Sequence, residues 1–222
     1  MADRNEIDFD FEALETEMYR DCANAFTSLQ LDFPDDPFYA YTMHVPEYMG
    51  YLSILAYTES SLHASAKEHL QRLNPPDDKV SFEILKDYWR HTCAADNHHK
   101  LVDTTSDLLG TFVLRCDALN EYYERELNVG WEPAQRIVES LREEILEVCQ
   151  RVMIRLDEAK VFELNNRRDN VTLMISHGDN DPRLEIVERL NPERVFKRYV
   201  KEYEAYKAAF TAIYGYVPDW IQ

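Results

Sequence analysis

The chain has 222 residues and a formal net charge of −18, and 45% of its residues are hydrophobic. A chain of this length and hydrophobic content can bury a substantial core, which excludes a disordered protein. Only 5 residues are glycine and 9 are proline, which argues against a loop-rich or all-β protein. The composition favours a single domain over residues 1–222.

The predicted elements begin with a helix over about residues 10–30. Its apolar positions recur every three or four residues, as on one face of a helix: Phe11, Leu14, Met18, Cys22, Ala25 and Leu29. Residues 38–45 and 50–58 are rich in aromatic and apolar residues and predict two strands of a hairpin. Both strands are apolar on both faces, so we expect helices or loops to cover both sides of the sheet.

The middle of the chain predicts mainly helices. A helix is expected over residues 59–73, and residues 77–98 fit either a strand at 80–85 or a helix at 82–90. Apolar residues then recur at steps of three and four over residues 99–127 and 133–162. We expect these segments to form a long antiparallel helix pair, because only a short link separates them.

The last third predicts a buried strand at residues 170–176, a turn at 177–182 and a short helix at 184–190. A final helix follows Asn191-Pro192-Glu193. Strands come in clusters, without strict alternation with helices, which favours the α+β class. We therefore expect a small sheet of three to five strands packed by several helices, including the long pair.

Three segments together resemble the bacterial family called domain of unknown function 4303. They are Asp36-Pro37-Phe38-Tyr39-Ala40-Tyr41, the strand 171–176 with acidic residues at Asp179 and Asp181, and Arg189-Leu190-Asn191-Pro192-Glu193. The family has no established activity, so the resemblance assigns no catalytic residues. Similar families are often encoded beside bacterial toxins, which implies an immunity role.

Negative charge is concentrated at the amino-terminal end, where residues 1–40 hold 11 acidic residues and only 2 basic ones. A surface of this sign repels nucleic acids and anionic membranes and attracts basic proteins. We therefore expect a basic protein partner, no nucleic acid and no membrane, unless the charge serves solubility alone. Asp32, Asp35, Asp36, Tyr39, Tyr41 and Tyr48 are the candidate partner-binding residues, since tyrosine anchors interfaces and acids select basic partners.

One dense cluster offers metal-ligand chemistry. His91, Cys93, Asp96, His98 and His99 lie within nine residues. Imidazole, thiolate and carboxylate groups are zinc ligands, although this spacing matches no standard metal motif. A solvated loop or helix start is the alternative interpretation of the same residues. Other carboxylate pairs fit turns and helix caps, and His44 fits a packed position on its strand.

The chain contains no glycine-rich phosphate loop, no GxSxG and no HExxH, so we assign no catalytic and no cofactor-binding residue. The acidic amino terminus, the lack of an 18-residue apolar stretch and cysteines without CxxC spacing predict a reduced, cytoplasmic protein. Our leading hypothesis is a non-enzymatic binding protein that neutralises a basic partner. A metal-dependent enzyme using the 91–99 cluster and a structural helper built on the helix pair are the alternatives. The protein is expected to be a monomer or a homodimer.

Overall fold

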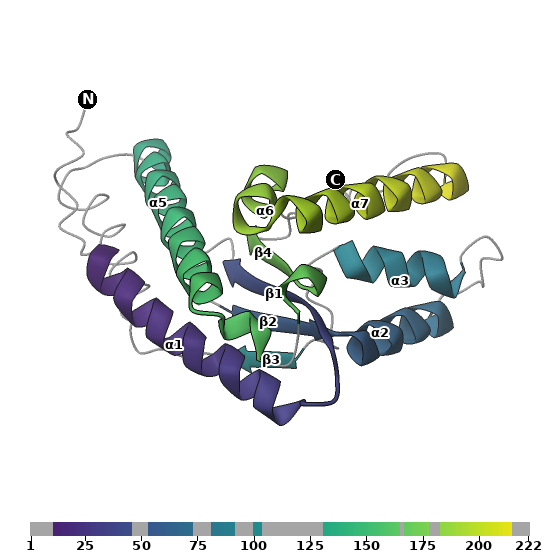
Figure 1. Cartoon of the computed structure of the whole chain (residues 1–222). Helices are drawn as coiled ribbons and strands as arrows, with labels where there is room; N and C mark the ends of the chain where they lie inside the picture. Colours follow the sequence, from purple (N-terminus) through teal and green to yellow (C-terminus); the bar gives the residue numbers. More distant parts are fainter. Residues whose placement is uncertain are drawn as a thin grey trace.

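The computed structural model describes residues 11–45, 53–72, 81–91, 100–103, 131–164, 167–177 and 183–214 (Figure 1). Four strands form one mixed sheet in the order β3-β2-β1-β4. They are β1 (Phe38–Val45), β2 (Ser53–Thr58), β3 (Lys100–Asp103) and β4 (Thr172–His177). β1 pairs antiparallel with β2 and parallel with β4, and β3 pairs antiparallel with β2. The predicted antiparallel pairing of the first two strands and the α+β class are confirmed.

One face of the sheet packs against α1 (Phe11–Asp32) and α5 (Trp131–Glu158). The predicted stripe of α1 is buried from Leu14 to Leu29, because its apolar side chains meet those of α5 and the sheet. Aromatic rings fill the centre of this layer. Tyr41 lies 5.2 Å from Phe26 and 4.9 Å from Phe162, measured between ring centroids.

The opposite face packs against α2 (Glu59–Arg72), α3 (Phe82–His91) and α7 (Glu193–Tyr214), while α6 (Leu184–Leu190) packs beside β4. Figure 1 shows these helices on the far side of the sheet from α1 and α5. Tyr199, Tyr203 and Tyr206 of α7 are all buried in this layer. The expectation that both faces of the hairpin are covered is confirmed.

A β-bulge at the start of β1 decides where Tyr39 points. The register between β1 and β2 shifts between Phe38 and Ala40. Tyr41 and Met43 face α1 and α5, and simple alternation would put Tyr39 there too. It packs instead with the α7 layer, because an extra residue in a strand re-aims the side chains next to it.

The side chain of Asn191, between α6 and α7, closes the outer edge of β4. Its Oδ1 accepts a hydrogen bond from the Leu173 amide at 2.9 Å, and its Nδ2 donates to the Leu173 carbonyl at 2.8 Å and the Val187 carbonyl at 2.7 Å. Arg168 donates to the Val171 carbonyl at 2.7 Å and the Leu190 carbonyl at 2.9 Å. These bonds fix α6 and the start of α7 against the sheet.

The helix expected over residues 99–127 is wrong at its start, because Lys100–Asp103 forms strand β3 on the open edge of β2. Residues 104–127 lie outside the described residues, so the predicted helix pair stays a prediction. The helix predicted over residues 133–162 is confirmed as α5, but it ends at Glu158, before the expected residue 162. Lys160 has a positive φ of 61°, a left-handed conformation that does not continue an α-helix.

The ambiguous segment 77–98 contains α3, so the helix predicted at 82–90 is confirmed and extends to His91, whereas the alternative strand at 80–85 is wrong. The late strand and the two last helices are confirmed as β4, α6 and α7. None of the helices within the described ranges combines the length and the apolar composition that a membrane span requires.

Candidate functional site

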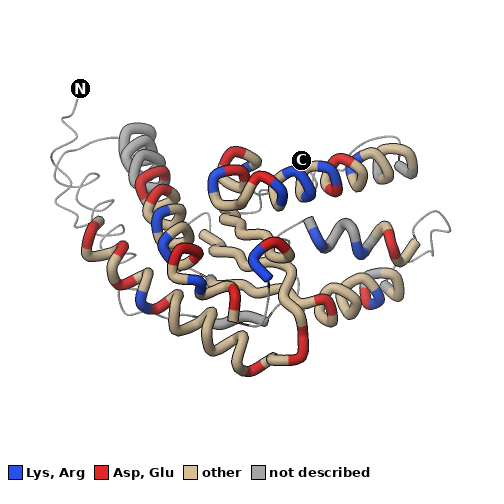
Figure 2. Tube along the Cα trace, viewed as in Figure 1, with Lys and Arg blue, Asp and Glu red and all other residues tan. Residues whose placement is uncertain are grey.

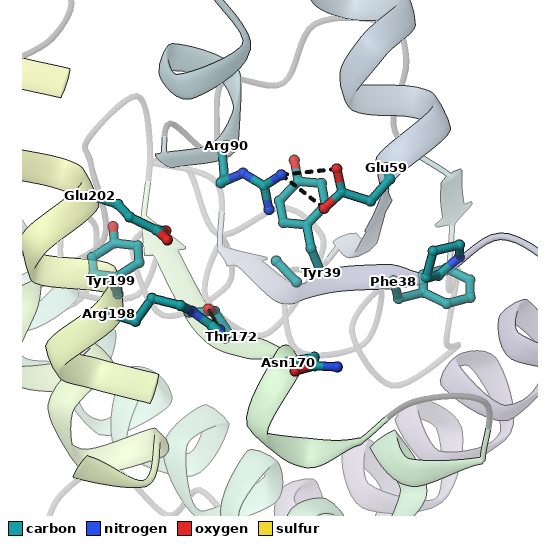
Figure 3. A pocket seen from close by; sticks show the side chains of 11 residues that line it. Phe38, Tyr39, Glu59, Arg90, Asn170, Thr172, Arg198, Tyr199 and Glu202 are labelled. Carbon is teal, nitrogen blue, oxygen red and sulfur yellow. Dashed lines mark hydrogen bonds and ion pairs between the residues drawn. The ribbon is translucent and has the colours of Figure 1, made fainter. Parts of the chain in front are cut away.

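A polar pocket of about 290 Å³ lies where the parallel strands β1 and β4 begin, between the start of α2, the end of α3 and the first half of α7 (Figure 3). We call it the arginine pocket. Its lining comes from β1 and the residues just before it, from η3 (Arg168–Asn170) and β4, and from three helices: Pro37, Phe38, Tyr39, Ala40, Glu59, Arg90, Asn170, Thr172, Arg198, Tyr199 and Glu202.

Arg90 enters the pocket from the end of α3. Its Nη2 donates to both carboxylate oxygens of Glu59, at 2.8 and 2.9 Å. Its guanidinium carbon lies 4.7 Å from the centroid of the Tyr39 ring, a cation–π distance. With 23% of its side chain exposed, Arg90 is held by an ion pair and an aromatic face while it still borders the pocket.

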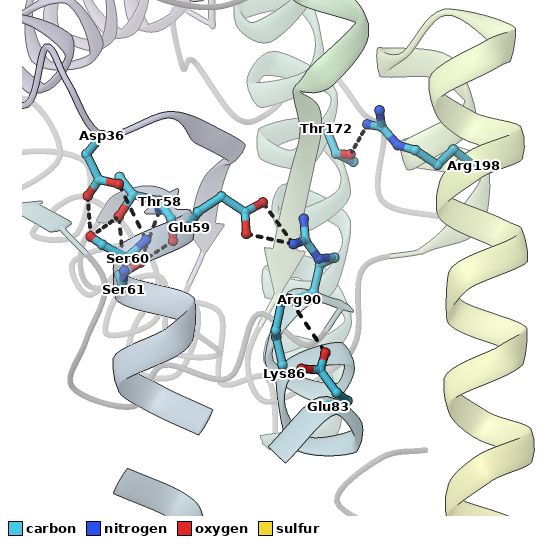
Figure 4. Close-up of polar contacts among 10 residues, drawn as sticks. All are labelled: Asp36, Thr58, Glu59, Ser60, Ser61, Glu83, Lys86, Arg90, Thr172 and Arg198. Carbon is cyan, nitrogen blue, oxygen red and sulfur yellow. Dashed lines mark hydrogen bonds and ion pairs between the residues drawn. The ribbon is translucent and has the colours of Figure 1, made fainter. Parts of the chain in front are cut away.

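Glu59 is itself positioned by the cap of α2. The Thr58 hydroxyl accepts a hydrogen bond from the Ser61 amide at 3.2 Å, and the Ser61 hydroxyl accepts one from the Thr58 amide at 3.1 Å. This reciprocal arrangement is a capping box with serine in the third helical position. Asp36 adds a hydrogen bond from the Ser60 hydroxyl (Figure 4). The cap therefore fixes the first turn of α2, and with it the partner of Arg90.

Arg198 borders the pocket from α7, across from Arg90 (Figure 3). It donates to the Asp169 carbonyl at 2.7 Å and, at the long distance of 3.5 Å, to the Thr172 hydroxyl. Both acceptors are neutral oxygens. Glu202, one turn further along α7, adds a second carboxylate to the lining.

A second feature, the acidic groove, lies along the first half of α1. Glu12, Glu15 and Glu17 line it together with Arg155 in a volume of about 560 Å³. Glu15 accepts hydrogen bonds from Arg151 at 2.6 Å and from Arg155 at 2.9 Å. The Arg151 bond, aided by Arg155, lowers the pKa of Glu15 against the opposing effect of burial. Figure 2 shows acidic residues in red at the start of α1 and on the neighbouring part of α5.

The structure separates most of the predicted partner-binding residues. Asp32 and Asp35 are exposed at the end of α1 and in the loop after it, whereas Asp36 is engaged by Ser60 at the start of α2. Tyr39 is 7% exposed, under Arg90. The expectation for Tyr41 is corrected, because a fully buried ring in the core cannot touch a partner. Tyr48 lies outside the described residues.

Of the predicted metal cluster, only His91 belongs to a described element, where it ends α3. Cys93, Asp96, His98 and His99 lie outside the described residues, so the zinc hypothesis stays a prediction. Elsewhere in the described ranges, no group of three or more His, Cys, Asp and Glu side chains is placed to hold a metal ion.

His44 and Ser176 form the other notable polar pair. The His44 Nδ1 lies 2.9 Å from the Ser176 hydroxyl, at the opposite end of β1 and β4 from the arginine pocket. Such a pair has the composition of a nucleophile and a base. Ser176, however, is only 1% exposed, so a substrate cannot reach its hydroxyl. This burial agrees with a packed role for His44.

Sequence reasoning missed the arginine pocket. Arg90 and Arg198 are 108 positions apart by residue number, and neither belongs to a recognisable motif. They line the same pocket only because α3 and α7 pack together over the same face of the sheet. The bulge that turns Tyr39 toward Arg90 has no glycine or proline signal inside the strand.

The described elements define a three-layer α+β protein with a mixed four-stranded sheet between two sets of helices. A family model described as "Domain of unknown function (DUF4303)" matches residues 18–192. The chain belongs to this family, which confirms the resemblance drawn from its sequence. No curated protein and no solved structure matches the chain.

Proposed function

We propose that this protein is a cytoplasmic, non-enzymatic binding protein that neutralises a basic protein partner, as an immunity protein does. The observation that carries the proposal is the acidic groove, whose lining holds three glutamates and one arginine. In sequence, the groove directly follows Asp3, Glu6, Asp8 and Asp10. Charge of one sign at one end of the chain favours encounter with a basic surface.

Within the groove, Glu12 and Glu17 are the side chains best suited to a partner. Glu15 is only 17% exposed and is already paired with Arg151 and Arg155. Glu12 is exposed and Glu17 is half-buried, on the same helix. Exposed carboxylates steer association over a range set by salt, about 8 Å at physiological ionic strength. The partner's lysines and arginines would meet these two residues first.

The test uses the product of the gene adjacent to the one that encodes this protein. Co-expression should relieve any growth defect that this product causes, and the purified pair should form a complex that weakens as salt rises from 50 to 500 mM. The double variant Glu12→Gln/Glu17→Gln should bind about 5- to 30-fold more weakly, since rim charges are each worth up to about 1 kcal/mol.

The matched control is Glu188→Gln/Glu204→Gln, which removes the same charge from exposed positions on α6 and α7. It should bind like the unmodified protein. A complex that is equally weakened by both double variants would point to net charge alone and would contradict a role for the groove. No complex with the adjacent product at either salt concentration would overturn the proposal.

A further inference from the structure

We propose that the arginine pocket binds a small anion, with the oxygens of one carboxylate or phosphate group held between Arg90 and Arg198. This inference is independent of the proposed function, because the pocket lies in the α7 layer and the acidic groove lies on α1. Its chemistry is that of guanidinium recognition, in which N–H groups in a planar fork donate to paired oxygens.

Both guanidinium groups are held in place before any ligand arrives. Arg90 is fixed by the Glu59 carboxylate and the Tyr39 ring, and Arg198 by the carbonyl of Asp169. Ordering a free arginine side chain costs on the order of 1–2 kcal/mol, and anchored side chains avoid most of that cost on binding. The two arginine side chains are therefore preorganised to bind an anion.

Donors remain on both side chains. An arginine has five N–H donors, whereas within the described part of the chain Arg90 donates two hydrogen bonds and Arg198 donates two. Glu59 balances the charge of Arg90. Among the described residues, Arg198 has no carboxylate within ion-pair distance, and its acceptors are neutral oxygens. The positive charge of Arg198 therefore favours an anionic ligand.

The remaining lining limits the size and charge of the ligand. The carboxylates of Glu59 and Glu202 border the same pocket and repel a ligand with several negative groups. A volume of about 290 Å³ suits a small molecule. Thr172 and Asn170 can supply neutral hydrogen-bonding groups beside the anion. These features select a small ligand with one carboxylate or one phosphate group.

The experiment titrates the full chain with inorganic phosphate and, separately, with benzoate, at constant ionic strength, and follows the arginine Nε–H signals by NMR and binding heat by calorimetry. We expect saturable binding of at least one probe, with the Arg198 Nε–H signal shifted. The probe that binds more tightly identifies phosphate or carboxylate as the source of the anion. Arg198→Gln should weaken binding at least 10-fold.

The control is Arg194→Gln, one turn earlier on α7, which removes a guanidinium that is 73% exposed and lies outside the pocket lining. It should bind like the unmodified protein. Arg198→Lys keeps the positive charge but loses the planar guanidinium donors, and it should bind the probe with intermediate affinity. The proposal is overturned if neither probe saturates up to about 10 mM, or if Arg194→Gln and Arg198→Gln weaken binding equally in folded protein.

Discussion

Burial controls the chemistry of the two described cysteines. Cys22 on α1 and Cys149 on α5 are 1% and 0% exposed, and both are free thiols in the core. Burial raises the pKa of Cys149 to about 12, and burial with the nearby Cys149 raises the pKa of Cys22 well above its usual value. Since the thiolate is the reactive form, these residues should behave as small apolar side chains.

We therefore predict that neither thiol reacts with a disulfide reagent in the folded protein. The measurement uses a variant in which Cys93 and Cys116 are serine, so that only Cys22 and Cys149 can react. At pH 8 the folded protein should release less than about 0.1 equivalent of chromophore in an hour, and unfolding in denaturant should release two. Rapid release of one equivalent from folded protein would show that the α1–α5 contact opens.

At the scale of elements, the edge of β4 depends on one amide side chain. Asn191→Ala would leave the amide and carbonyl of Leu173 without their partner inside the protein. Each buried, unsatisfied polar group costs about 1–3 kcal/mol, so we expect the free energy of unfolding to fall by about 2–4 kcal/mol. Urea unfolding gives this value, and hydrogen exchange at Leu173 should accelerate selectively. Asn24→Ala, at an exposed position on α1, should change stability by less than about 0.5 kcal/mol.

The ion pairs of Glu15 tie α1 to α5 and give stability a specific pH dependence. The folded pKa of Glu15 lies below its unfolded value of about 4.5, chiefly because of Arg151. The carboxylate therefore adds stability above that pH, and the contribution is lost as pH falls through the folded pKa. We expect Glu15→Gln to lower the free energy of unfolding at pH 7 by about 1 kcal/mol, a small value because both arginines are more than a third exposed.

Denaturant unfolding of Glu15→Gln beside the unmodified protein, from pH 7 down to pH 3, measures this contribution. The difference between the two proteins should shrink toward zero at the acidic end. Glu12→Gln serves as the control and should track the unmodified protein at every pH. A difference that stays constant with pH would mean that Glu15 acts through packing and not through its charge.

How far the sequence predicts the elements depends on how local their signals are. The stripe of α1 and the strand 38–45 follow from residues that are close together in the chain, and both are found where they were expected. β3 is different, because Leu101 belongs to the apolar pattern that predicts a helix over residues 99–127 and also fits a strand. The open edge of β2 decides between them, and that edge exists only in the assembled sheet.

At the scale of the whole molecule, two faces of one sheet carry different chemistry. The α1–α5 layer carries the acidic groove, and the α2–α3–α7 layer carries the arginine pocket. The sequence predicts an acidic amino-terminal end directly, since charge can be counted along the chain. It does not predict the pocket, because Arg90, Arg198 and Tyr39 are brought together by helix packing and a β-bulge.

The proposed recruitment of a basic protein partner by the acidic groove can be measured through the association rate of that complex. Stopped-flow measurement with the product of the adjacent gene should give a rate constant that falls at least 10-fold between 50 and 500 mM salt. The association rate constant of the Glu12→Gln/Glu17→Gln variant should fall less steeply with salt than that of the Glu188→Gln/Glu204→Gln variant. A rate constant that is independent of salt, or identical salt slopes for the two double variants, would contradict the claim.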